Sequence, residues 1–241
     1  MTYPVFIVCR DRLTCLLGLL DWLEAVGHDR EVYLIDNDSS YPPLLDFYKR
    51  TRHKVLWMGG NYGHRVGWTN DVLRPLTQGR KFVYTDPDVI PIEGCPPDAI
   101  ERMAKVLDKD GAAVKCGFGI KVDDLPDWCR DGIQAWEARF WNDFVGRVGG
   151  YRAPIDTTFA LYAGFATKKF KYKPAWRLPE PYLLRHLPWY VDPNALSDED
   201  EYYRAHADIK VSNWSRYVVD HQDAIKPQQL ASQVSQRWEA S

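Results

Sequence analysis

The sequence predicts an α/β fold, with a mainly parallel, doubly wound sheet flanked by helices and a less regular C-terminal region. Two observations lead to this prediction. Short apolar runs alternate with helical patterns through about the first half of the 241-residue chain, which is typical of β-α-β units around a parallel sheet. After about residue 117 the alternation loosens, and many of the 10 Trp and 14 Tyr residues lie in this second half. One domain spanning residues 1–241 is expected at this length.

The elements of the first half follow from local patterns. Residues 4–9 form an apolar run typical of a buried strand, and leucines then recur at helical spacing from residue 13 to residue 23. Asp11 is expected to cap this helix, and Gly27 to end it. Further strands are predicted at residues 31–35, 54–57, 81–85 and 112–116, and further helices at residues 42–50, 66–76 and 99–107.

The second half gives fewer patterns. A helix is expected around residues 134–144, a break at Gly149-Gly150, a strand around residues 157–163 and a helix around residues 197–207. Residues 168–177 are locally basic and interleaved with aromatic residues, and such a patch could contact the phosphates of DNA. We expect the C-terminal segment either to pack back over the active face or to trail into solvent.

Composition excludes several classes of protein. The net charge of -2 and the pI near 6.3 give no overall basic field, which weighs against broad binding to nucleic acid or anionic membranes. The five cysteines are widely spaced and form no C-x-x-C pair, so neither a disulfide framework nor a zinc knuckle is indicated. No apolar run approaches the length of a membrane span, and no leader pattern precedes the first strand. These features predict a cytoplasmic protein without stable membrane association.

Asp86-Pro87-Asp88 directly follows the strand predicted at residues 81–85. Two carboxylates therefore leave the sheet at the edge where parallel α/β sheets bind ligands. Residues two apart in an extended segment face the same side, and hard oxygen ligands suit Mg²⁺ or Mn²⁺ bridging to phosphate oxygens. A turn with solvated acids is the commoner explanation for such a tripeptide alone. Its position after a strand favours the metal site.

Polar residues follow the other predicted strands as well. Arg10-Asp11-Arg12 comes after the first strand, where a guanidinium could bind a diphosphate, or could lie on the surface beside a helix cap. Asp36 follows the second predicted strand and favours a ligand, whereas residues 38–40 could equally bind a ligand or form an Asx-turn. After the third strand, residues 59–65 combine glycines with hydrogen-bonding side chains, and Asn70 lies about one helical turn beyond.

The order of these motifs resembles the GT-A fold glycosyltransferases, especially the family 2-like group. The resemblance covers roughly residues 4–120. Its motifs are, in order, P-V-F-I-V-C-R-D-R, I-D-N-D-S-S, G-G-N-Y-G-H-R-V-G-W-T-N and Y-T-D-P-D-V. Each motif alone is weak, and the ordered set is specific. The chain departs from the family at Arg10-Asp11-Arg12, where small polar residues are usual.

The resemblance implies a GT-A (Rossmann-like) fold and a nucleotide-diphosphate sugar, most often a UDP-sugar, as donor. In that reading Asp88 is the principal ligand of Mn²⁺ or Mg²⁺, and Asp86 assists through the ribose or a water. Asp36 would contact the nucleobase. Residues 1–120 would bind the donor and residues 121–241 the acceptor. Asn61 and Gly63 would lie in the donor-side segment. Arg10 and His64 are the other donor-side candidates, because they follow predicted strands.

The same resemblance implies site residues in the second half. GT-A enzymes often complete the metal site with a C-terminal histidine, and His186 is preferred because aromatic residues and a proline flank it; a histidine packed in the core is the alternative. An inverting reaction needs a carboxylate to deprotonate the acceptor, and Asp156 is the first candidate. A retaining enzyme would need no such base. The less favoured residues are His206 and His221 for the metal, and Asp192, Asp123 and Asp124 for the base.

Other functions fit the sequence less well. No G-x-G-x-x-G follows the first strand and no P-loop is present, which disfavours dehydrogenases and P-loop enzymes. A phosphatase would carry its paired acids after the first strand, and a nucleotidyltransferase would open with a Gly-rich loop. A non-catalytic carbohydrate- or nucleic-acid-binding module remains as an alternative, using Trp176, Trp189, Tyr190 and residues 168–173. The acceptor could be a saccharide, a protein, a small molecule or a modified DNA base.

Overall fold

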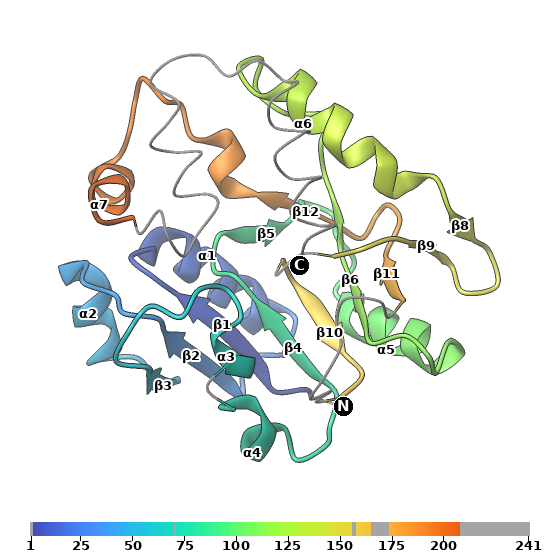
Figure 1. The fold of residues 1–241 in the computed structure, drawn as a ribbon, viewed down its shortest axis with the longest axis horizontal. Coiled ribbons are helices and arrows are strands. Elements are labelled where there is room, and N and C mark those ends of the chain that lie inside the picture. Colours follow the sequence, from blue (N-terminus) through green and yellow to red (C-terminus); the bar gives the residue numbers. More distant parts are fainter. Residues whose placement is uncertain (1, 70, 156–157, 165–173, 208–241) are drawn as a thin grey trace.

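A large mixed sheet runs through the part of the chain that the structure describes (Figure 1). The structure is a computed structural model, and it describes residues 2–69, 71–155, 158–164 and 174–207. Within these ranges the sheet has nine strands in the order β3-β2-β1-β4-β10-β6-β11-β9-β8. Their bounds are β1 Val5–Cys9, β2 Val32–Asp36, β3 Lys54–Trp57, β4 Phe82–Thr85, β6 Lys115–Gly117, β8 Phe144–Val145, β9 Gly150–Arg152, β10 Ala160–Tyr162 and β11 Ala175–Arg177.

Strand direction confirms the predicted fold class. β3, β2, β1 and β4 are parallel neighbours, and β11 is parallel to β6. Among the described strands of this sheet, only β10 and β9 run against the others. The predicted strand at residues 157–163 contains β10, whose antiparallel insertion beside β4 could not be read from its sequence alone.

Helices cover both faces of the sheet. Side chains of a strand alternate between the two faces, and here both sets are apolar, so both faces need to be covered. Val5 and Ile7 of β1 pack with α1 (Leu13–Ala25), α2 (Pro42–Tyr48) and α5 (Ala99–Lys109). Phe6 and Val8 point to the other face, where Val66 contributes from the short helix α3 (Val66–Thr69), alongside α4 (Leu73–Thr77). The result is the doubly wound arrangement that the sequence predicts.

A second, smaller sheet has no counterpart in the sequence-based prediction. Its order is β5-β12-β7, with β5 at Val89–Pro91, β12 at Leu183–His186 and β7 at Gly119–Ile120. β12 is antiparallel to β5 and parallel to β7. The pairing aligns His186 with Val89, directly after Asp88. This sheet therefore brings the C-terminal region to the end of β4.

Several helix boundaries differ from those expected. The single helix predicted at residues 66–76 is wrong: α3 and α4 are separate, and Asp71 between them has a φ of 51°. Such a left-handed backbone interrupts a right-handed helix. The helix predicted at residues 134–144 begins earlier, as α6 (Arg130–Glu137), and continues as a 3₁₀ turn. Near the C-terminus, α7 (Asp198–His206) confirms the helix expected there.

No helix within the described ranges is both long and apolar enough to cross a bilayer.

Candidate functional site

The carboxyl ends of β1, β2 and β4 lie together at one edge of the large sheet. In the strand register Cys9 lies beside Asp36, and Ile7 beside Thr85. The backbone N–H of Asn37 donates to the carbonyl of Cys9 at 2.9 Å, which extends the pairing by one step. The polar residues that follow each strand therefore share this edge, as the sequence predicts.

Asp88 and His186 are brought together by the small sheet. The backbone N–H of Leu187 donates to the carbonyl of Asp88 at 2.8 Å, at the end of the β5–β12 pairing. His186 Nε2 then lies 3.8 Å from Asp88 Oδ1. The side chain of His186 is 8% exposed, and its ring meets the ring of Trp189 edge-on, at 4.9 Å between centroids. Packing thus fixes the histidine beside the carboxylate.

The pair fits a divalent cation shared with a phosphate ligand. Asp88 Oδ1 is buried and accepts no hydrogen bond from the described residues. Two ligands at roughly 2.1 Å from one ion lie at most about 4.2 Å apart, so a separation of 3.8 Å is compatible with a shared ion. The described residues contain no group of three or more His, Cys, Asp or Glu side chains suited to a metal. The remaining ligands would have to come from substrate and water, as is usual for Mg²⁺.

Asp36 is a buried carboxylate at the end of β2. Its Oδ2 accepts a hydrogen bond from Ser39 N at 3.3 Å. Its Oδ1 is buried and has no hydrogen-bond partner among the described residues. Burial raises the pKa of Asp36 above its ordinary value, against the lowering effect of the Ser39 hydrogen bonds. Contact of this acid with a nucleobase remains a prediction, and a free acceptor oxygen is what such a contact requires.

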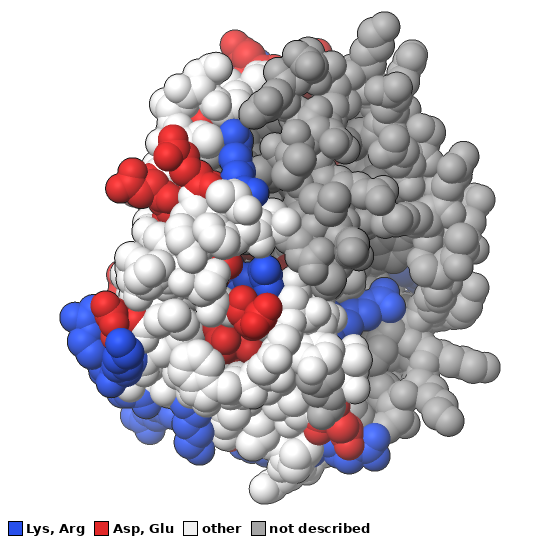
Figure 2. All heavy atoms as spheres, turned by 60° about the vertical axis from the view of Figure 1, so that its left-hand side comes forward, with Lys and Arg blue, Asp and Glu red and all other residues white. Residues whose placement is uncertain are grey.

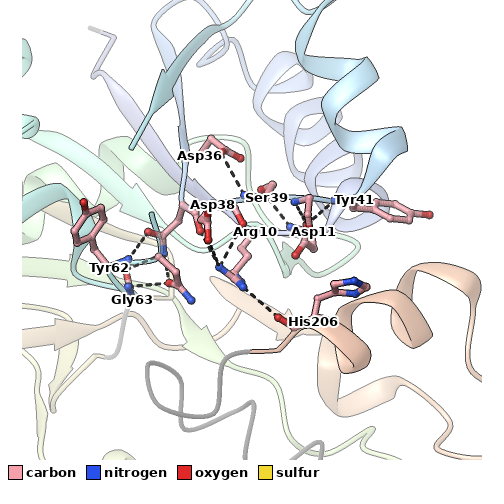
Figure 3. A network of polar contacts seen from close by, with 12 residues as sticks. Arg10, Asp11, Asp36, Asp38, Ser39, Tyr41, Tyr62, Gly63 and His206 are labelled. Carbon is pink, nitrogen blue, oxygen red and sulfur yellow. Dashed lines mark hydrogen bonds and ion pairs between the residues drawn. The ribbon is translucent and has the colours of Figure 1, made fainter. Parts of the chain in front are cut away.

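Asn37 holds the loop that follows β3, and sequence reasoning did not single it out. Its Nδ2 donates to Asn61 Oδ1 at 3.0 Å and to the carbonyl of Gly63 at 3.2 Å. Its Oδ1 accepts from the backbone N–H of Tyr62 at 2.9 Å. Figure 3 shows these contacts joining the loops after β2 and β3. Asn61 and Gly63 therefore lie at the predicted edge, and Asn61 acts there as an internal bridge.

His64 is exposed, and its backbone carbonyl is hydrogen-bonded to a residue of β4. The hydroxyl of Tyr84 donates to the carbonyl of His64 at 2.8 Å and accepts from the backbone N–H of Gly67 at 3.3 Å. A Cβ at Gly67 would lie 2.8 Å from the Tyr84 ring, so only glycine allows this approach. The loop that carries His64 is thus anchored next to the strand that precedes Asp86.

Arg10 binds protein carbonyls in this structure. Its guanidinium donates to the backbone carbonyls of Asn37, Asp38 and His206 at 3.2, 3.3 and 3.1 Å, and it lies 3.7 Å from the Asp38 carboxylate. Figure 3 shows Arg10 between the loop after β2 and the end of α7. Its donation of hydrogen bonds to a diphosphate remains a prediction that these contacts do not favour.

The expected helix cap at Asp11 is wrong. Asp11 does not cap α1; its Oδ1 accepts from the backbone N–H groups of Ser40 and Tyr41, at 2.6 and 2.8 Å, at the entry to α2. The N-terminus of α1 is capped by Glu199 of α7, whose Oε2 accepts from Leu13 N at 2.8 Å and Thr14 N at 3.0 Å. A φ of 50° at Asp11 turns its side chain toward the neighbouring loop.

Several other predicted residues lie outside the described ranges or have structural roles. Asp156, Asn70, His221 and residues 168–173 lie outside the described residues. Asp123 pairs with Lys121 at 2.6 Å, and Asp124 pairs with Arg185 at 2.5 Å. Asp192 and His206 are engaged locally: Asp192 Oδ1 accepts from Asn194 N, and His206 Nδ1 lies 2.8 Å from the Tyr202 carbonyl.

Two residues assigned to a binding surface are part of the interior. Trp176 is fully buried, and its Nε1 donates to Asp110 Oδ2 at 2.8 Å. Arg177 is 3% exposed and forms a 2.5 Å ion pair with Glu137. Neither the stacking role of Trp176 nor a surface basic patch reaching Arg177 is therefore correct. Both side chains stabilise the core around β11.

The surface over the carboxyl ends of β1, β2 and β4 is hollowed. Figure 2 turns the side that carries α2 and α7 toward the viewer and shows acidic and basic side chains lying together within a depression. The charged residues that the contacts place on this side include Arg10, Asp38 and Asp200. A depression lined by both signs of charge suits a ligand that carries phosphate groups together with a cation.

Several solved structures resemble this chain at low sequence identity. One is glucosyl-3-phosphoglycerate synthase from Mycobacterium tuberculosis with phosphoglyceric acid, at 12% identity and a TM-score of 0.43, covering 67% of this chain and 57% of that one. The same enzyme was solved with Mn²⁺, UDP-glucose and glycerol 3-phosphate, at a TM-score of 0.42. HddC from Yersinia pseudotuberculosis, complexed with GMP-PN, is 13% identical with a TM-score of 0.42, over 73% of this chain and 89% of that one.

The chain therefore spans little more than half the length of the mycobacterial synthase. No known family and no curated protein sequence matches this chain.

The residues that sequence reasoning missed carried weak signals. Asn37 lies between two acids in I-D-N-D-S-S, where an Asx-turn explains any of the three. Glu199 and Asp200 follow Ser197 as an ordinary helix start, and in the structure Ser197 and Asp200 form a capping box. Their contacts with residues 12–14 depend on tertiary packing, which no local pattern encodes.

Proposed function

We propose that this protein transfers a sugar from a nucleotide-diphosphate sugar to an acceptor hydroxyl, assisted by Mn²⁺ or Mg²⁺. The observation that carries the proposal is the pairing of Asp88 Oδ1 with His186 Nε2 at 3.8 Å, at the carboxyl edge of a parallel sheet. Asp86, Asp36 and Asn61 follow neighbouring strands at the same edge. This is where such sheets bind nucleotides.

Each candidate site residue has a proposed role in this reaction. Asp88 and His186 would hold the cation, and Asp86 would support the donor through its ribose or a water. The buried Oδ1 of Asp36 would accept a hydrogen bond from the base. A bound divalent ion would neutralise the departing diphosphate. The acceptor oxygen would bond to the anomeric carbon as the bond from that carbon to the diphosphate breaks, and Asp156 is the proposed recipient of the acceptor proton in an inverting reaction.

A donor panel read by thermal unfolding tests this function. UDP-, GDP- and ADP-sugars would each be added with Mn²⁺ and with EDTA. A ligand at about 100 times its Kd stabilises a fold by roughly 2.7 kcal/mol, which for a chain of this size raises Tm by about 5–10 °C. We expect one donor to give such a shift only when Mn²⁺ is present. No metal-dependent shift with any donor would contradict the proposal.

A further inference from the structure

Arg12 is a buried arginine at the edge that holds the candidate site, and its described partners come from α7. Its Nη1 lies 2.5 Å from Asp200 Oδ1, and its guanidinium carbon lies 4.1 Å from the centre of the Tyr203 ring. The residue is 8% exposed. A charge taken this far from water is costly unless ionic and hydrogen-bonding partners replace its hydration.

Arg12 is incompletely satisfied by the described residues. Its Nε is buried and has no hydrogen-bond partner within the described ranges. Buried polar groups in folded proteins almost always have such a partner, and an unpaired one is destabilising. Burial lowers the pKa of Arg12, but the hydrogen bond to Asp200 and the nearby charge of Asp88 raise it above its ordinary value. Arg12 is thus a permanent cation with a donor unused among the described residues, and its charge interacts favourably with that of Asp88.

The partner of Arg12 is itself held in place. Asp200 Oδ2 accepts from the hydroxyl of Ser197 at 2.6 Å and from its backbone N–H at 3.3 Å, while Asp200 Oδ1 faces Arg12. These contacts lower the pKa of Asp200, although burial acts in the opposite direction. The Tyr202 hydroxyl donates to the Ser40 carbonyl at 2.9 Å. α7 is therefore fastened to the loop after β2 as well as to Arg12.

Arg10 has a different set of contacts. Its donors reach three backbone carbonyls, so this guanidinium joins the loop after β2 to the end of α7. Arg12 keeps a donor that no described residue uses. The sequence-based prediction placed Arg10, and not Arg12, on the donor side, whereas the unused donor belongs to Arg12.

We propose that Arg12, and not Arg10, binds the donor diphosphate beside Asp88, and that α7 positions Arg12 through Asp200 and Tyr203. The inference rests on the proposed function and deepens it. A guanidinium presents donors in a fixed planar fork that matches phosphate oxygens. Asp200 and the Tyr203 ring limit the rotation of that fork, so the remaining donor points in one direction before the ligand arrives.

Calorimetric titration with MnCl₂ present tests the proposal. UDP, GDP and ADP, and the corresponding monophosphates, would be titrated into the full chain and into Arg12→Gln and Arg52→Gln. Arg52 is a matched control, since its ion pair with Asp29 lies on an exposed surface at the start of β3. Loss of a charge-assisted hydrogen bond typically weakens binding by about 10- to 100-fold. We expect that loss for the diphosphate in Arg12→Gln, a smaller loss for its monophosphate, and no change in Arg52→Gln.

The positioning role has its own readout. Asp200→Asn and Tyr203→Leu keep Arg12 but remove a contact that orients it. We expect each to lower the ratio of the monophosphate Kd to the diphosphate Kd, by less than Arg12→Gln does. If Arg12→Gln does not fold, Arg12→Lys keeps the charge without the fork, and the same preference should still fall. An unchanged preference in a folded Arg12 variant would overturn the inference. Such an unchanged preference would leave the proposed function standing as long as the wild-type chain binds one of the diphosphates. If the wild-type chain binds no diphosphate, both proposals fail.

Discussion

At the scale of single residues, the candidate site contains polar groups that the fold leaves unsatisfied. Asp36 Oδ1 and Asp88 Oδ1 are both buried without a hydrogen-bond partner in the described part of the chain. Such groups reduce stability, and they are common where a protein binds a ligand that completes them. Removing the charge at such a position should therefore stabilise the fold while it damages binding.

Asp36→Asn tests this at the level of stability. Because burial raises the pKa of Asp36, the folded chain binds its proton more tightly than the unfolded chain does. The free energy of unfolding contributed by Asp36 therefore falls as pH rises through the raised pKa. We expect the variant to be more stable than wild type at pH 7, and the difference to shrink as pH falls toward the ordinary value of 3.8. Urea unfolding from pH 7 to pH 5 measures it; a variant that is less stable throughout would contradict the argument.

Asn37→Ala tests the internal bridge to residues 61–63. The change removes three hydrogen bonds of a side chain that is 3% exposed. At about 0.5–1.5 kcal/mol each, their loss should lower the free energy of unfolding by roughly 2–3 kcal/mol. Asn37→Asp is the comparison variant, because it keeps the acceptor for Tyr62 N and replaces the donor with a charged oxygen that faces Asn61 Oδ1 and the Gly63 carbonyl. We expect Asn37→Asp to cost at least as much as Asn37→Ala, and no cost in either variant would refute the bridge.

At the scale of elements, α7 and β12 connect the C-terminal region to the N-terminal sheet. α7 caps α1 through Glu199 and pairs with Arg12 through Asp200. β12 pairs with β5 and so delivers His186 to Asp88. Figure 1 shows β12, late in the chain, beside β5. The site is thus built from both halves of the sequence.

Glu199→Ala tests the cap between the two helices. Oε2 of Glu199 accepts from two N–H groups in the first turn of α1 and lies 3.3 Å from the Thr14 hydroxyl. A lost N-terminal cap costs about 1–2 kcal/mol, so we expect that loss in the free energy of unfolding and faster amide exchange at residues 13 and 14. Glu201→Ala changes an exposed acid of the same helix and should cost much less. Equal effects of the two changes would rule out the cap.

At the scale of the whole molecule, local sequence patterns predicted the elements that bury a continuous apolar face. The apolar runs of β1, β2 and β4 and the stripe of α5 are visible in the sequence because these elements bury continuous apolar faces. The edge that gathers Asp36, Asn61 and Asp88 follows from strand order in a parallel sheet.

Long-range pairing could not be predicted in the same way. The antiparallel insertion of β10, the β5–β12–β7 sheet and the capping of α1 by Glu199 join residues far apart in the chain. The spacing of apolar residues along the chain does not predict which distant segments pair. Trp176 was misread for a related reason: an aromatic residue in a polar stretch resembles a binding residue, whereas its partner Asp110 lies on a distant loop.

Release of nucleoside diphosphate from nucleotide sugars tests the central claim most directly. The wild-type chain, Asp88→Asn and Asp46→Asn, an exposed control on α2, would be incubated with UDP-, GDP- and ADP-sugars in Mn²⁺ or in EDTA. A metal ion supplies several kcal/mol of transition-state stabilisation, equivalent to a rate change of about 100-fold or more. We predict release from one donor by wild type and Asp46→Asn in Mn²⁺, with at least that loss in EDTA and in Asp88→Asn. Release that neither EDTA nor Asp88→Asn reduces, or no release from any donor, would contradict the account.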